Sequence, residues 1–381
     1  MSLETNKKTR DRDEEIARSL TTWFKTSARD LPWRRTRDPY AIWISEVMLQ
    51  QTRVETVIPY FARFLDRFPN VHALAKAELD EVLSLWSGLG YYRRARELHA
   101  CARQVSETHE GVFPAEAEQL RKLRGIGQYT AGAVSSIAFG RQAPLVDGNV
   151  ARVIARLEAL DDDIKSSAGI KSIWATATKL VPREEPGIFN QALMELGATL
   201  CVPRDPACLV CPVNKLCSAR RQGRERDLPV VGAKRVSPRV LLVVAVVESR
   251  GELLFGRRKE GGLFGGLWEA PMVEASTLAD ARHALEGAGV PRKTELVEAG
   301  RVEHVLTHRE LDVLVTHARV DRPWVLVEPT TEPYERLAWT RPDEGGIGIS
   351  TLTKKILAKA TGGGPGKKVA RSGAAKKKQP G

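Results

Sequence analysis

The sequence has no long hydrophobic run, and its first fifteen residues hold no apolar stretch. Its longest apolar stretch, Val240 to Val247, has eight residues, whereas a membrane-spanning helix needs roughly 20. Met1 to Glu15 carry charges of both signs and no apolar signal-peptide core, which argues against export. With 42% hydrophobic and 28% charged residues, the composition also excludes a wholly disordered, collagen-like or coiled-coil chain. We therefore expect a cytoplasmic protein without membrane contact, with two or three domains in 381 residues.

Acidic residues are outnumbered, with 47 Asp and Glu against 59 Lys and Arg. The net charge of +12 predicts a polyanionic partner such as nucleic acid. Six of the twelve net charges lie in residues 361–381, which contain no acid, so the rest of the chain is only mildly basic. This Gly- and Lys-rich tail fits a disordered solubilising end and a DNA tether equally well.

Hydrophobic periodicity divides the chain into two parts. Apolar residues recur at helical spacing from Asp13 to Val202, whereas the chain beyond Arg239 is typical of strands with one helix, at residues 278–286. The stretch from Ser218 to Arg239 is polar and aperiodic, which is typical of a linker. There are no internal repeats. We predict a helical domain (residues 1–225), a linker (226–239), an α+β domain (240–360, with strands near 240–247, 252–255, 303–306, 310–317 and 324–327) and a disordered basic tail (361–381).

Four of the five cysteines are crowded into residues 201–217 with the spacing C-x6-C-x2-C-x5-C: Cys201, Cys208, Cys211 and Cys217. In a reducing compartment, such crowding favours a metal site over disulfides. Zinc sites usually pair two short knuckles across a longer spacer, so one tight pair with longer arms favours a [4Fe–4S] cluster. Cys101 stands alone in a helical stretch and is expected to be a small buried residue.

A glycine-rich turn separates two helical stretches at residues 121–134. Gly125 and Gly127 allow a sharp turn, and the amides at the start of the next helix, up to Thr130, can hold a phosphate without reading sequence. About twenty residues later, Asp147 follows an apolar segment and precedes Gly148 and Asn149. Taken alone, the turn fits an ordinary helix connection and the aspartate fits a helix N-cap.

In this order, the hairpin, the aspartate and the cysteine run resemble the helix-hairpin-helix DNA glycosylases that carry an iron–sulfur cluster. Three further motifs, LPWR at residues 31–34, WISEVMLQQT at 43–52 and GLGYYRRAR at 88–96, narrow the resemblance to the MutY family of adenine DNA glycosylases. The resemblance implies an all-α glycosylase domain followed by an α+β Nudix-like domain. It also implies removal of adenine mispaired with 8-oxoguanine or guanine in double-stranded DNA by a monomeric, nucleoid-associated enzyme.

The resemblance assigns the chemistry to two carboxylates, as in ordinary glycosidases. Glu46 is the acid that protonates adenine N7, and the apolar residues around it in the sequence favour its neutral form. By the same resemblance, Asp147 holds or transiently bonds the sugar cation, Asn149 lies beside it, and Tyr129 supports the acid–base network. In the lyases of the superfamily, a lysine at the position of Tyr129 forms a Schiff base with the sugar. Tyrosine here implies a monofunctional glycosylase.

The target adenine must leave the base stack to be cleaved. The resemblance implies that Gln51 and Tyr91 act as wedges in the duplex, flanked by Thr52 and Leu89. Arg34 and Gln191 match positions that line the adenine pocket. Without the motifs, each of these residues fits an ordinary surface or core position equally well.

In the second domain, the segment GGLFGGLWEAP at residues 261–271 resembles the opening of a Nudix fold. The catalytic loop of Nudix hydrolases is absent, and His283 and Gly287 replace two of the three metal-binding acids, so catalytic Mg²⁺ binding is not expected. The family reads 8-oxoguanine with a Phe-Ser-His hairpin, matched here by Leu306, Thr307 and His308. The hydroxyl and the imidazole are retained and the aromatic ring is lost; a plain exposed turn is the alternative.

Three other functions compete with adenine excision. A lyase for oxidised pyrimidines is disfavoured by Tyr129 and by the additional domain. A non-catalytic DNA-damage-binding module is disfavoured by the acid pair Glu46 and Asp147. A Nudix pyrophosphatase lacks the necessary carboxylates.

Overall fold

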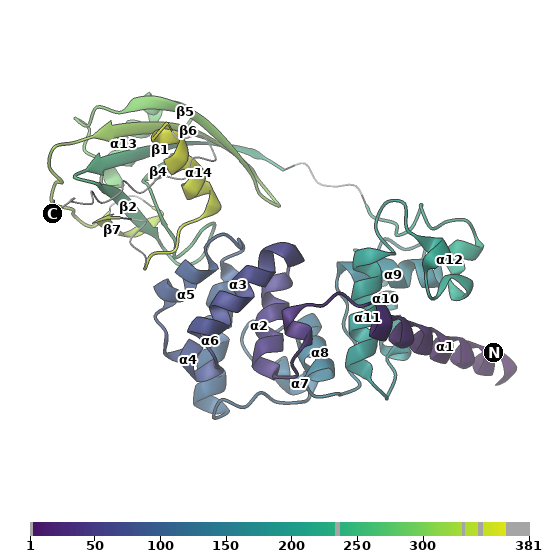
Figure 1. The fold of residues 1–381 in the computed structure, drawn as a ribbon. Coiled ribbons are helices and arrows are strands. Elements are labelled where there is room, and N and C mark those ends of the chain that lie inside the picture. Colours follow the sequence, from purple (N-terminus) through teal and green to yellow (C-terminus); the bar gives the residue numbers. More distant parts are fainter. Residues whose placement is uncertain (1–2, 233–236, 330–331, 342–345, 363–381) are drawn as a thin grey trace, which may run out of the picture. The chain divides into compact units, whose positions relative to one another are not determined.

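A computed structural model describes residues 3–232, 237–329, 332–341 and 346–362. The chain divides into two compact units (Figure 1): Met1–Leu85 with Arg93–Arg235, and Trp86–Tyr92 with Val236–Gly381. The basic tail predicted at residues 361–381 lies almost entirely outside the described residues. No described helix is long and apolar enough to cross a membrane.

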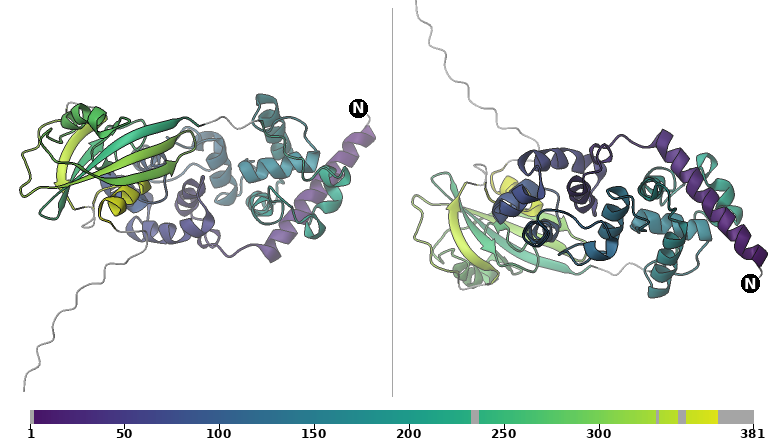
Figure 2. Two further views of the ribbon diagram at one scale, coloured as in Figure 1. Left: turned by 90° about the horizontal axis from the view of Figure 1, so that it is seen from above. Right: turned by 90° about the horizontal axis from the view of Figure 1, so that it is seen from below.

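One group of helices in the first unit joins the start of the chain to its later part. The helix α1 (Leu3–Ser27) packs against α10 (Ser167–Leu180) and α11 (Pro186–Thr199), and α9 (Gly148–Glu158) packs against α10, α11 and α12 (Ser218–Arg221). Both views of Figure 2 show α1, in purple, lying along this group. As its spacing predicts, α1 buries Ile16, Leu20 and Phe24 in the shared core.

A second group contains the helices between residues 39 and 137. The helix α2 packs against α3, α6 and α8, and α8 packs against α11, which connects the two groups. Nearly all of α2 is buried, from Tyr40 to Met48. The bounds are α2 (Pro39–Leu49), α3 (Val54–Arg67), α4 (Val71–Lys76), α5 (Leu79–Trp86), α6 (Arg93–Thr108), α7 (Ala117–Leu120) and α8 (Gln128–Ile137), with short 3₁₀ turns at η1 (Pro32–Arg34), η2 (Cys208–Val210) and η3 (Asn214–Leu216).

Residues 226–232 of the predicted linker belong to the first unit. Leu228 is buried, and its carbonyl accepts a hydrogen bond of 2.8 Å from Nε of Arg156. Ile164 donates its backbone N–H to the carbonyl of Val230 at 3.1 Å. A buried guanidinium needs acceptors for its N–H groups, and this aperiodic segment supplies one of them.

The second unit is built on a mixed sheet with the strand order β3-β2-β1-β6-β5, in which β4 also pairs with β1 and β7 with β2. Strands β1 and β6 are parallel, with Val243 opposite Leu314, and the other pairs are antiparallel. The bounds are β1 (Arg239–Ser249), β2 (Glu252–Arg258), β3 (Trp268–Glu269), β4 (Met272–Glu274), β5 (Val297–Val305), β6 (Glu310–Arg319) and β7 (Tyr334–Thr340).

Two helices explain why β1 is apolar on both faces. Val243 and Val247 share a core with α13 (Leu278–Gly287), whereas Val244 and Val246 share the opposite core with α14 (Thr351–Ala360). A strand covered on both faces reads as a continuous apolar run, whereas a half-exposed strand alternates. The strands predicted at 240–247, 252–255 and 310–317 and the helix at 278–286 are confirmed; the strand predicted at 303–306 matches only the end of β5.

The strand predicted at residues 324–327 is wrong. These residues alternate as in a strand: Val325 and Val327 are exposed, while Trp324 and Leu326 pack against the core. They form no ladder with a neighbouring strand. Instead, the Trp324 ring packs edge-on against Trp339 with centroids 5.0 Å apart, and its Nε1 donates to the carbonyl of Gly289 at 3.1 Å. Alternation therefore reflects one-sided burial here without strand pairing.

Candidate active site

A cavity of about 710 Å³ in the first unit gathers most of the predicted site residues. It lies among η1, α2, the turn that follows α2, and the helices α8, α9 and α11. Glu46 and Asp147 both line it, although about a hundred residues separate them in sequence. The other predicted residues in its wall are Arg34, Gln51, Thr52, Tyr129, Asn149 and Gln191.

Glu46 is held in the buried helix α2. Asp38 caps this helix by accepting hydrogen bonds from the backbone N–H groups of Tyr40 and Ala41, and Glu46 is 4% exposed. Burial raises the pKa of Glu46 to about 7, against the partly opposing hydrogen bond from Tyr129 and with a further contribution from the charge of Asp147. A carboxylic acid with a pKa near 7 holds a proton that it can donate at neutral pH.

Tyr129 contacts this carboxyl group directly. It comes from α8, and its hydroxyl donates a hydrogen bond to Oε2 of Glu46. The Sδ atom of Met194 lies 3.4 Å from the same hydroxyl. Burial raises the pKa of Tyr129 well above its ordinary value, so the phenol stays protonated and remains a donor.

Asp147 is the N-cap of α9 and also faces the cavity. Its Oδ1 accepts the backbone N–H of Val150 at 2.7 Å, and its Oδ2 accepts Nδ2 of Asn149 at 3.1 Å. Burial raises the pKa of Asp147, while these hydrogen bonds act in the opposite direction. The N-cap predicted as the ordinary alternative is therefore present, and it holds the carboxyl group in a fixed orientation.

Asn149 is itself held from the other side. Arg152, one turn later on α9, donates from Nη2 to Oδ1 of Asn149 and to the carbonyl of Gly197, both at 2.8 Å. Its Nε donates to the carbonyl of Cys201 at 2.8 Å. The amide of Asn149 is thus oriented with its nitrogen toward Asp147 and its oxygen toward Arg152.

Sequence reasoning missed an ion-pair cluster in the same cavity wall. Glu195 on α11 is 1% exposed and pairs with Nε of Arg29 and Nη2 of Arg34, each at 2.7 Å. Although burial opposes ionisation, the hydrogen bonds from the two guanidinium groups lower the pKa of Glu195 to about 2. Glu195 resembles Glu46 in standing alone among apolar residues of a buried helix. That pattern was the available signal for it.

The glycine-rich turn leads into α8 as predicted. Gly125 has φ +72°, and a Cβ atom there would lie 2.7 Å from Cβ of Glu97, so only glycine fits. Gly127 is the N-cap of α8 and has no side chain to cover the first amides. The side chain of Thr130 is turned inward: it is 2% exposed, and its Oγ1 accepts a hydrogen bond from Nε2 of Gln50 at 3.2 Å. Only its backbone belongs to the helix start.

Four predicted DNA-contacting residues belong to the second unit. Thr307 and His308 are exposed in the turn between β5 and β6, which the hydrogen bond from Leu306 N to Arg309 O closes at 2.8 Å. Tyr91 is 47% exposed, and its hydroxyl lies 2.7 Å from Oγ1 of Thr307. Leu89 is only 5% exposed.

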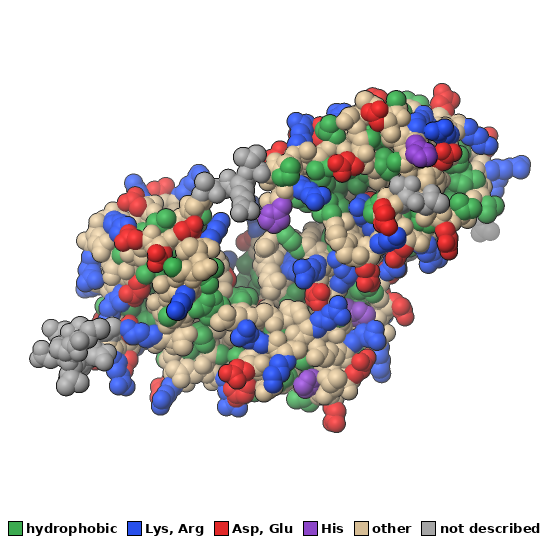
Figure 3. Space-filling view, turned by 180° about the vertical axis from the view of Figure 1, so that it is seen from behind, with side chains coloured by type: hydrophobic (Ala, Val, Ile, Leu, Met, Phe, Trp, Pro, Cys, Tyr) green, Lys and Arg blue, Asp and Glu red, His purple; other side chains and the backbone are tan. Residues whose placement is uncertain are grey.

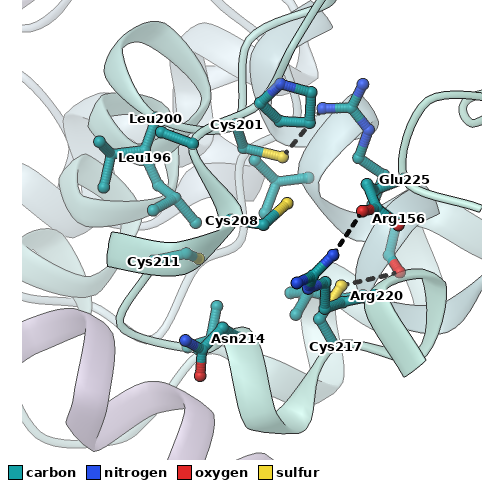
Figure 4. A pocket seen from close by; sticks show the side chains of 15 residues that line it. Arg156, Leu196, Leu200, Cys201, Cys208, Cys211, Asn214, Cys217, Arg220 and Glu225 are labelled. Atoms are coloured by element: carbon teal, nitrogen blue, oxygen red, sulfur yellow. Dashed lines mark hydrogen bonds and ion pairs between the residues drawn. The ribbon is translucent and has the colours of Figure 1, made fainter. Parts of the chain in front are cut away.

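The four clustered cysteines line one cavity of the first unit (Figure 4). Nη1 of the buried Arg156 lies 3.3 Å from Sγ of Cys201, and Sγ of Cys217 lies 3.3 Å from the Arg156 carbonyl. Burial raises the pKa of the Cys211 thiol to about 12. Among the described residues, no three His, Cys, Asp or Glu side chains are placed to hold a single metal ion. Cys101 is fully buried, as predicted.

Surface charge is mixed outside these sites. On the face seen in Figure 3, Lys and Arg side chains are interspersed with Asp and Glu side chains over both units. Exposed ion pairs of the first unit include Arg67 with Glu81 and Arg141 with Glu116. On this face, the basic side chains are therefore spread among acidic ones.

Comparison with known proteins places the chain in a family. The model described as "HhH-GPD superfamily base excision DNA repair protein" matches residues 44–183, and a NUDIX domain model matches residues 242–359. Human adenine DNA glycosylase is 37% identical over 91% of this chain and 74% of its own length; the rat protein is 40% identical over 89% and 77%. A solved thermostable thymine-DNA glycosylase, 32% identical with a TM-score of 0.52, covers 56% of this chain and 99% of its own. The expected helical glycosylase domain and Nudix-like α+β domain are confirmed, and the chain belongs to the adenine DNA glycosylase family of base excision repair.

Proposed function

We propose that the protein hydrolyses the N-glycosidic bond of adenine mispaired with 8-oxoguanine or guanine in double-stranded DNA. The observation that carries the proposal is a buried Glu46, with a pKa of about 7, sharing one cavity with Asp147. Cleavage of this C–N bond needs a proton for the leaving base and an anion for the sugar cation. Glu46, with a pKa near neutrality, meets the first need, and Asp147, the N-cap of α9, meets the second.

Glu46 is the proposed proton donor and acts on adenine N7. Protonating the ring converts adenine into a neutral leaving group as the glycosidic bond breaks. Once ionised, Glu46 can accept a proton from the attacking water, with Tyr129 holding its Oε2 in place. The proton therefore returns to Glu46 at the end of each cycle.

Asp147 is the proposed stabiliser of the sugar cation. Its two oxygens are oriented by Val150 N–H and Asn149 Nδ2, so it can approach the sugar without a change of rotamer. Preorganised charge of this kind costs no rearrangement at the moment of reaction. Because Tyr129 stands where the lyases have a lysine, no amine is supplied for a Schiff base at that position, and the strand stays uncut.

DNA recognition is assigned to four parts of the chain. Arg34 and Gln191 line the pocket of the extruded adenine, and Glu195 orients Arg34 there by accepting a hydrogen bond from its guanidinium group. Gln51 and Tyr91 enter the duplex, with Thr52 and Leu89 beside them. The amides that follow Gly125 and Gly127 hold a phosphate. Thr307 and His308 at the exposed β5–β6 turn read 8-oxoguanine opposite the adenine.

We also propose a [4Fe–4S] cluster held by Cys201, Cys208, Cys211 and Cys217. Four thiols lining one cavity, with a buried guanidinium beside one sulfur, fit the donor set of such a cluster. When bound, the cluster supplies four bonds that fix the loop after α11. Monomeric action on DNA is part of the same proposal.

Glu46→Gln tests the proposal most directly. The amide keeps the shape of the side chain and cannot supply the proton, so binding of an A:8-oxoguanine duplex should persist while excision is lost. The matched control is Glu107→Gln, an exposed glutamate on α6. We would follow single-turnover excision on gels after alkali. Near-normal excision by Glu46→Gln would show that another group is the acid.

A further inference from the structure

One side chain forms hydrogen bonds both to the end of α2 and to the turn between α2 and α3. Arg94, the second residue of α6, donates from Nη1 to the carbonyls of Val47, Met48 and Gln50 at 2.7, 2.9 and 2.6 Å. Its Nη2 donates to Oγ1 of Thr52 at 3.1 Å. We infer that Arg94 is a positioning residue that holds Gln51 in the conformation needed to enter the duplex. This inference rests on the proposed function.

Helix α2 cannot satisfy these carbonyls itself. The last four C=O groups of any helix lack intrahelical partners, and Val47 and Met48 belong to the last turn of α2. A guanidinium at a helix C-terminus also interacts favourably with the negative end of the helix dipole. Arg94 therefore satisfies the end of the helix that carries Glu46 and continues beyond it to Gln50 and Thr52.

The conformation of Gln51 gives this arrangement a functional meaning. Gln51 is exposed and has φ +58°, a left-handed conformation that is uncommon for a residue other than glycine. Such residues persist where the surrounding structure determines their backbone. Arg94 bonds to the residues directly before and after Gln51, and Gln50 is also bonded through its amide to Thr130. The residues on either side of Gln51 are thus both held by hydrogen bonds, while Gln51 itself is exposed.

Holding Gln51 in place affects extrusion of the adenine, which is a different step from proton donation by Glu46. A preformed wedge favours extrusion of the adenine, because no backbone rearrangement has to accompany entry into the duplex. Loss of Arg94 should therefore lower the fraction of extruded base in the bound complex. The pKa of Glu46 should change little, since its burial and its contacts with Tyr129 and Asp147 do not involve Arg94.

The test compares Arg94→Met with Arg93→Met, which removes the same charge from an exposed neighbour on the same helix. Both are made with and without Glu46→Gln. In the Glu46→Gln background, a duplex with 2-aminopurine in place of the target adenine, opposite guanine, reports extrusion by fluorescence at saturating protein. We expect Arg94→Met to lower the extrusion equilibrium by about tenfold or more, the scale of a released backbone strain. With Glu46 intact, the rate of excision should fall while the midpoint of its pH profile stays in place.

Thr52→Val and Arg94→Lys keep the inference testable if Arg94→Met folds poorly. Each substitution removes the hydrogen bond between Arg94 and Oγ1 of Thr52. Their effects on extrusion should therefore be non-additive in a double-mutant cycle. Extrusion that is equal in the Arg94 and Arg93 variants, or additive effects of Thr52→Val and Arg94→Lys, would overturn the inference. Absence of adenine excision by the unmodified protein would instead overturn the proposed function.

Discussion

Replacing Tyr129 by phenylalanine should make excision less sensitive to alkaline pH. The Tyr129 hydroxyl donates to Oε2 of Glu46 and in this way favours the ionised carboxylate, which opposes the effect of burial. Burial and the charge of Asp147 both raise the pKa of Glu46, and removing the hydroxyl removes a contact that lowers it. The pKa of Glu46 should therefore rise above its present value of about 7.

The size of the change follows from the strength of the lost bond. A hydrogen bond to a charged group is worth about 1.5–3 kcal/mol, and one pKa unit corresponds to about 1.4 kcal/mol. The alkaline limb of the profile should therefore move up by about one to two pH units. The neutral acid is the active form, so activity present below the pKa of Glu46 is lost as the pH rises through it. The variant retains its activity to higher pH.

The assay is kcat/KM for adenine excision from pH 5.5 to 9.5, because this quantity reports the free enzyme. Each profile is normalised to its own acid plateau, since loss of the hydroxyl also loosens Glu46 and lowers the plateau. Tyr60→Phe on α3, outside the cavity, is the control. An alkaline limb that stays in place or moves down in Tyr129→Phe would refute the reasoning, because the hydrogen bond would then not act on an ionising Glu46.

Three further predictions follow from the other sites. Protein purified under anaerobic conditions should be yellow-brown, with absorbance near ~400 nm and about four irons per chain; zinc without iron would contradict the cluster. Strand breakage should appear only after alkali or heat, and efficient trapping of a covalent adduct by borohydride would contradict the role given to Tyr129. Thr307→Val should lower the preference for A:8-oxoguanine over A:G by about tenfold or more, since a side-chain hydrogen bond to a base edge is worth ~1–3 kcal/mol; an unchanged ratio would remove Thr307 from lesion reading.

Local sequence patterns predicted most helices and strands, because the buried face of a helix or strand requires apolar residues at the spacing of that structure. The apolar spacing of Ile16, Leu20 and Phe24 could be satisfied only by one helix face against a core. The same logic failed for residues 324–327, where alternation came from tryptophan packing without a strand partner. Residues 226–232 show no period although Leu228 among them is buried, because Arg156 donates a hydrogen bond to the Leu228 carbonyl, and such a contact leaves no periodic trace in the sequence.

The sequence by itself determined the family, the two domain types and the candidate acids, because long motifs and isolated carboxylates in apolar helices are visible along the chain. Tertiary structure decided what those residues contact. It set Glu46 and Asp147 in one cavity, buried the Thr130 side chain, and brought Glu195 to Arg29 and Arg34. It also brought Arg94 to the turn around Gln51. The physical reason is that hydrogen bonds and desolvation depend on separation in space, and residues far apart in sequence share no period from which their contact could be read.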